Sequence, residues 1–205
     1  MKKLSFAIIA LLSFITATAQ QDFAKHLAEA RTAYAAGKLD DSRFAMQQMM
    51  QELDIITGKE VLKLLPPKMM NENALTASDN VTGASGFFGV LIHREYGVAA
   101  KGNAADSMMN KNISLEIISN SPIIGTINAL LSMPFIGNSG DQKIVKINGY
   151  KALVSKSGSD TTPEWELQLP LNNSLVTLRA PGRSQDDVIK MANTLPVAEI
   201  AKMLQ

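Results

Sequence analysis

The stretch that decides the fold of this chain is KIVKINGYKALVSK, residues 143–156. Asn148-Gly149 stands between two apolar runs. This dipeptide is the preferred two-residue loop of a type I′ hairpin, because both loop positions need a positive φ. The stretch therefore predicts two antiparallel strands, over residues 143–147 and 150–156.

The predicted pairing continues toward the C-terminus. Residues 164–169 alternate between polar and apolar side chains, which indicates a strand with one wet face. Asn172-Asn173 predicts a turn, and residues 175–179 are typical of a final strand. The four strands are expected to form an antiparallel meander.

Further strands and helices are expected around this meander. Alternation predicts strands over residues 88–92 and 113–117, and helical spacing predicts an apolar helix over 122–133. After the meander, Ser184 begins a helix with a capping-box pattern, and Pro196 begins a shorter one. Helices set apart from a mainly antiparallel sheet define the α+β class, which we expect here.

The N-terminal third has helical periodicity. Gly37 separates two apolar stripes at helical spacing, and Gly58 is expected to break the second helix. The stripes consist of Phe23, Leu27, Ala30 and Tyr34, and of Met46, Met49, Met50, Leu53 and Ile56. Two helices joined by a few residues form an antiparallel hairpin, which cannot bury its apolar stripes by itself.

The first residues predict export. Two lysines precede an apolar run over residues 4–15, and Ala17-Thr18-Ala19 follows it. This order is typical of a secretory signal peptide over residues 1–19, with cleavage between Ala19 and Gln20. The apolar run is too short for a stable membrane span. We expect an exported protein, located in the periplasm or outside the cell.

Four segments are therefore expected. The signal peptide of residues 1–19 precedes the helical hairpin of residues 20–66. Residues 67–85, rich in Pro, Asn, Ser and Gly, are expected to form a linker. Residues 86–205 form the predicted α+β domain.

Composition excludes several partners. Removing residues 1–19 leaves 18 basic and 19 acidic residues, a net charge of −1, and no basic run exceeds two residues. Nucleic acid and anionic lipid are therefore not expected partners, and no membrane span is expected in the mature chain. Cysteine is absent, which excludes disulfides, thiolate metal sites and thiol nucleophiles.

Two segments resemble known folds. Tyr34 followed by Gly37-Lys38-Leu39-Asp40 resembles the turn of a single tetratricopeptide-type helix pair. The element order over residues 88–204, with Ile147-Asn148-Gly149-Tyr150 in its meander, resembles the PsbP/Mog1-like fold. The second resemblance implies a non-enzymatic binding or assembly module and transfers no functional residue.

One segment resembles the nucleophile region of trypsin-like serine proteases. It is Gly137-Asn138-Ser139-Gly140-Asp141. Such a nucleophile needs a histidine base, and the chain has only His26 and His93. A cluster of Gly, Asn, Ser and Asp is more often a loop, so no catalytic residue is predicted.

Other candidate sites also favour structural interpretations. His93 and Glu95 share one strand face, but two ligands are too few for zinc, so an ion pair is predicted. Glu164 and Glu166 share a face opposite Trp165, so they are expected to solvate the sheet and not to form a glycosidase pair.

Met46, Met49 and Met50 invite a copper(I) hypothesis because thioethers are soft ligands. Their stripe continues into Leu53 and Ile56, which cannot bind a metal, so packing in a core or interface is predicted. No metal or cofactor site is expected.

We therefore expect an exported, non-enzymatic binding or envelope-assembly protein of unknown ligand, with a protein partner at the hairpin. One alternative is a carrier of a hydrophobic small molecule or lipid, held between the sheet and the helix of residues 122–133. A weaker alternative is a serine hydrolase that uses Ser139.

Overall fold

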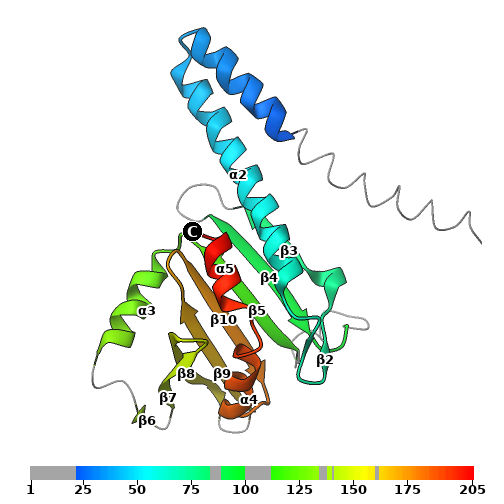
Figure 1. Cartoon of the computed structure of the whole chain (residues 1–205), viewed down its shortest axis with the longest axis vertical. Helices are drawn as coiled ribbons and strands as arrows, with labels where there is room; N and C mark the ends of the chain where they lie inside the picture. Colours follow the sequence, from blue (N-terminus) through cyan, green and yellow to red (C-terminus); the bar gives the residue numbers. More distant parts are fainter. Residues whose placement is uncertain (1–21, 84–88, 100–111, 134–137, 140, 160–161) are drawn as a thin grey trace, which may run out of the picture. The chain divides into compact units, whose positions relative to one another are not determined.

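A computed structural model describes residues 22–83, 89–99, 112–133, 138–139, 141–159 and 162–205. The predicted signal peptide and its cleavage point between Ala19 and Gln20 lie outside these residues. The chain divides into two compact units between Ile56 and Thr57. A helical hairpin is followed by an antiparallel sheet packed with helices, which confirms the α+β class (Figure 1).

The hairpin of the first unit consists of a helix over residues 22–35 and the first part of α2 (Leu39–Leu64). Gly37 has a φ of 71°, which lets the chain reverse between the helices. Ala30 and Ala45 are buried, and the Oγ of buried Ser42 donates a hydrogen bond to the Ala30 carbonyl oxygen at 3.0 Å. These small side chains let the two helices approach closely.

The second unit contains an eight-stranded antiparallel sheet in the order β3-β4-β5-β10-β9-β8-β7-β6. Its strands are β3 (Asn80–Gly83), β4 (Val90–Tyr96), β5 (Ile113–Ser119), β6 (Asn138–Ser139), β7 (Gln142–Ile147), β8 (Tyr150–Ser159), β9 (Thr162–Pro170) and β10 (Ser174–Pro181). Strands β7, β8, β9 and β10 are consecutive in the chain, and each pairs with the next in the sheet, which confirms the predicted meander. Asn148 and Gly149 have φ values of 48° and 92°, as the type I′ turn requires.

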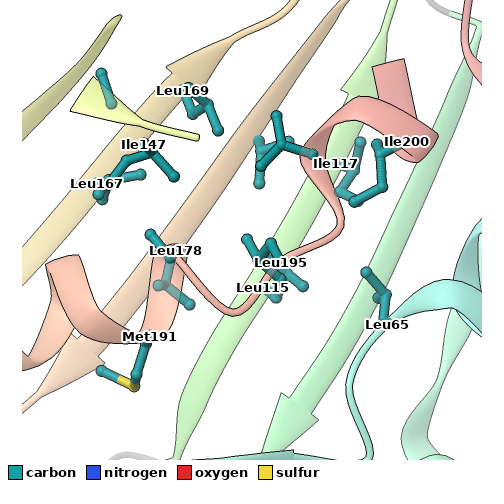
Figure 2. Packing of buried hydrophobic residues seen from close by; sticks show 14 of the residues in the cluster. Leu65, Leu115, Ile117, Ile147, Leu167, Leu169, Leu178, Met191, Leu195 and Ile200 are labelled. Carbon is teal, nitrogen blue, oxygen red and sulfur yellow. The ribbon is translucent and has the colours of Figure 1, made fainter. Parts of the chain in front are cut away.

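One face of the sheet, here the inner face, carries the main core. It packs against α4 (Gln185–Ala192) and α5 (Val197–Met203), as Figure 2 shows. Leu115, Leu178 and Met191 are fully buried there. Ser184 and Asp187 form the predicted capping box at the start of α4.

The opposite, outer face is covered at one end by α3 (Ile123–Ser132). Ile124, Ile127 and Leu131 of this helix form a second buried cluster with Leu153 of β8 and Leu175 of β10. Beyond this cluster the outer face carries the polar side chains of His93, Glu116 and Arg179, together with the partly buried cross-strand pair of Leu91 and Ile118.

The expected linker of residues 67–85 contains regular structure. It includes β1 (Lys68–Met69) paired with β2 (Glu72–Asn73), the short helix η1 (Thr76–Ser78) and the edge strand β3. These short, polar elements lack the periodicity that identifies strands in a sequence.

Gly58 does not break the second helix, contrary to the prediction. α2 continues to Leu64, and a Cβ at position 58 would lie 2.6 Å from Val81 and 2.8 Å from Val90. The glycine therefore serves close packing of this part of α2, which belongs to the second unit, against β3 and β4.

Candidate functional site

The hairpin presents large apolar side chains to solvent. Their exposed fractions range from 39% to 67%, although side chains of this kind are usually buried. We call this set the hairpin face: Leu27, Tyr34, Leu39, Met46, Met50 and Leu53.

Helical geometry places these side chains on one side of the hairpin. Leu27 and Tyr34 are two turns apart, and Met46, Met50 and Leu53 recur at i, i+4 and i+7. Ala30 and Ala45 are buried where the two helices touch. On each helix, the exposed stripe is rotated about the helix axis away from this contact, and the sense of rotation is the same for both helices. In antiparallel helices, equal rotations lead to the same side, so the two stripes adjoin.

A groove of about 540 Å³ follows the small side chains of the hairpin. Ala28, Thr32 and Ala36 of the first helix line it together with Phe44 and Ala45 of α2. Phe44 is itself 61% exposed. Glu29, Lys38 and Asp41 also line the groove, so the hairpin offers a concave surface with an apolar floor and charged residues in addition to the hairpin face.

The methionines of the hairpin face are exposed, whereas the second unit contains both buried and exposed methionines. Met46 and Met50 are 50% and 59% exposed, whereas Met69 and Met191 are fully buried. The stripe predicted from the sequence is thus split: Met49 is partly buried, and its neighbours face solvent. Interface packing fits the exposed pair better than core packing does.

A polar network crosses the outer face of the sheet. His93 lies 3.7 Å from Glu95, its neighbour on β4, and 3.7 Å from Glu116, its cross-strand partner on β5. Arg179 of β10 lies 3.7 Å from Glu116 and 2.6 Å from Glu166 of β9. Hydrogen bonding to Glu166 raises the pKa of Arg179, against the opposing effect of burial.

This network neutralises charge within the sheet. No group of three or more His, Cys, Asp or Glu side chains that could hold a metal occurs among the described residues. Sequence reasoning identified His93 and Glu95 but missed Glu116 and Arg179, because β4, β5 and β10 are distant in the chain. Trp165 packs on the core of the inner face, opposite Glu164 and Glu166, as predicted.

The residues of the serine hydrolase hypothesis are distant from one another. Ser139 lies on the edge strand β6, and His93 lies on β4, six strands away in the sheet. At about 4.8 Å per strand this is ~29 Å along the sheet. His26 belongs to the hairpin, where its Nδ1 lies 2.9 Å from Glu29. Gly137 and Gly140 lie outside the described residues.

The interval between α3 and the sheet is filled by side chains of the second buried cluster. A hollow of about 490 Å³ in the second unit lies elsewhere, between residues 74–78, Glu95 and Ala99 at the edge of β4. The site that a lipid carrier would use is therefore packed at the place where it was expected.

A buried ion pair fixes the segment that leads into the sheet. Arg94 is 6% exposed, and its Nε and Nη2 donate to the two carboxylate oxygens of Asp79 at 2.8 and 2.6 Å. Beside it, burial raises the pKa of Tyr96 to about 12, and the Arg94 cation opposes the rise. This site could not be predicted from the sequence, since Arg94 occupies an ordinary strand position.

No family model, curated protein or solved structure matches the chain. The resemblances to the PsbP/Mog1-like fold and to a tetratricopeptide-type helix pair therefore stay predictions. Among the described residues, no helix combines the length and the apolar character needed to cross a bilayer.

Proposed function

We propose that this chain is an exported, non-enzymatic binding protein that acts in envelope assembly, and that the hairpin face docks on a protein partner. The observation that carries the proposal is the exposure of six large apolar side chains on one side of a two-helix unit. Contiguous apolar patches of this kind mark interaction sites on soluble proteins.

The organisation of the second unit supports this proposal. Its inner sheet face is closed by α4 and α5, and one end of the outer face is closed by α3. Four charged or titratable side chains of the outer face, His93, Glu116, Arg179 and Glu166, pair with one another. The second unit thus has the character of a scaffold, and the hairpin is the part that needs a partner.

Cross-linking in cells tests the docking. A photoreactive amino acid at Met50, which is 59% exposed, should give a discrete cross-linked product. The same group at Lys190, whose side chain is 72% exposed on α4, is the matched control and should give none. Equal cross-linking at both positions, or none at Met50, would contradict the proposal.

Intact mass spectrometry tests export. The purified protein should begin at Gln20, and replacing Ala19 with phenylalanine should leave the chain unprocessed, because signal peptidases require a small residue there. A wild-type mass that still includes residues 1–19 would contradict the export part of the proposal.

A further inference from the structure

The exposed side chains of α2 follow the spacing of a coiled-coil interface. Leu39, Met46 and Leu53 are separated by seven residues each, and Met50 lies between the last two at the second core position of the heptad. We call these four residues the α2 seam. Their exposed fractions are 64%, 50%, 45% and 59% in the order given.

Two charged residues accompany this seam. Arg43 occupies the heptad position equivalent to Met50, one repeat earlier, and Asp54 follows Leu53 directly. Neither has an ion-pair partner among the described residues. They are eleven residues apart, about 16 Å along the helix, so they cannot pair with each other in one chain. Burial raises the pKa of Asp54, which indicates a partly desolvated carboxylate without a compensating cation.

We propose that the α2 seam pairs with the α2 seam of a second copy of this chain, antiparallel, about a twofold axis beside Gln48. This inference rests on the proposed function and names the partner of the hairpin face. In this register Met50 opposes the partner's Met46, and Arg43 lies beside the partner's Asp54.

Charge selects this arrangement over the parallel one. In the antiparallel register, Arg43 of one copy and Asp54 of the other lie within one residue of each other along the helix axis, on the same side of the interface. The twofold axis repeats this contact, so the dimer contains two such pairs. A parallel pair in register would place Arg43 against Arg43 in its core and would leave each Asp54 at the rim without an opposing cation. Like charges placed opposite each other in an interface disfavour that pairing.

The exposed area fits a reversible dimer. With roughly 200 Å² for a large side chain, the four seam residues expose about 450 Å² per copy, or about 900 Å² for the pair. Stable interfaces bury about 1,200–2,000 Å², and the rim adds to the seam. We therefore expect a dimer that dissociates on dilution.

Charge variants test the pairing through sedimentation equilibrium of the purified protein over a concentration series. Arg43→Asp and Asp54→Arg should each weaken self-association by about tenfold or more, because each replaces two attractive contacts with repulsive ones. The double variant, Arg43→Asp with Asp54→Arg, should associate like the wild type. An equimolar mixture of the two single variants should form a heterodimer.

The mixture is the decisive arm, because rescue between separate chains cannot arise within one helix. Circular dichroism at 222 nm checks that the exposed substitutions leave the helices intact. A wild type that is monomeric at all concentrations, or single variants that associate unchanged, would overturn the inference. A monomeric wild type that still cross-links at Met50 to a different protein would overturn this pairing and support the proposed function.

Discussion

Removing the guanidinium of Arg94 is expected to be among the most damaging single changes in the second unit. Arg94→Ala leaves the carboxylate of Asp79 without its cation, and the Asp79 side chain is only 15% exposed. Breaking a buried ion pair by deleting one partner costs about 3–5 kcal/mol. Domains of this kind have about 5–15 kcal/mol of stability in total, so the loss would be large.

Urea unfolding followed by tryptophan fluorescence measures this cost. Trp165 is the only tryptophan and packs on the core of the second unit, so it reports on that unit. The matched control is Arg179→Ala, which removes an arginine whose side chain is 43% exposed and lies 2.6 Å from Glu166. This half-exposed pair should contribute about 1 kcal/mol or less.

A paired replacement separates the loss of attraction from the penalty of an unpaired charge. Arg94→Met combined with Asp79→Leu removes both charges and should recover most of the stability lost in Arg94→Ala. If Arg94→Ala cost no more than Arg179→Ala, the claim that burial makes this pair decisive would be refuted.

Three further changes test other parts of the second unit. In the wild type, burial raises the folded-state pKa of Tyr96 to about 12, so the stability that its neutral phenol contributes is full below pH 10 and falls as pH rises through the folded pKa. The wild type should therefore lose about 2–3 kcal/mol of stability between pH 10 and 12, and Tyr96→Phe should not show this loss. Urea titrations of both proteins across this range measure the difference, with Tyr150→Phe as the control. Gly58→Ala should cost about 1–3 kcal/mol because the new methyl group meets Val81 and Val90, and a thermal-unfolding midpoint equal to the wild type would contradict the close contact. Ser184→Ala should cost about 1 kcal/mol through loss of the helix cap, measured by the same urea assay, and no loss would argue against the capping box.

The elements that local chemistry determines were predictable from the sequence. Asn148-Gly149 specifies its turn through backbone conformation, and Ser184 specifies the start of α4 through a side-chain hydrogen bond. The meander follows because each of its strands pairs with the next in the chain. Such contacts are short in sequence, so a pattern can reveal them.

The features that depend on distant segments were not predictable. β3 pairs with β4 although its four residues have no apolar alternation, and Arg94 is buried because Asp79 folds back onto it. The predicted helix break at Gly58 is wrong because a sequence does not show which strand approaches a glycine. The same limit hid Arg179, whose partners lie on β5 and β9.

The candidate site was predicted in part. Helical spacing identified the apolar stripe of α2, but spacing alone does not say which half of a stripe faces the neighbouring helix. Burial of Ala45 and Ser42 assigns one side of α2 to the hairpin, and that assignment leaves Met46 and Met50 exposed.

Methionine oxidation in intact cells tests the central claim, that a partner covers the hairpin face. Exposed methionines oxidise to sulfoxides faster than buried ones, and Met133, which is 50% exposed, is an internal reference outside the hairpin. We predict that peroxide oxidises Met46 and Met50 as fast as Met133 in the dilute purified protein but several-fold more slowly in cells. Equal oxidation of all three methionines in cells would contradict the account.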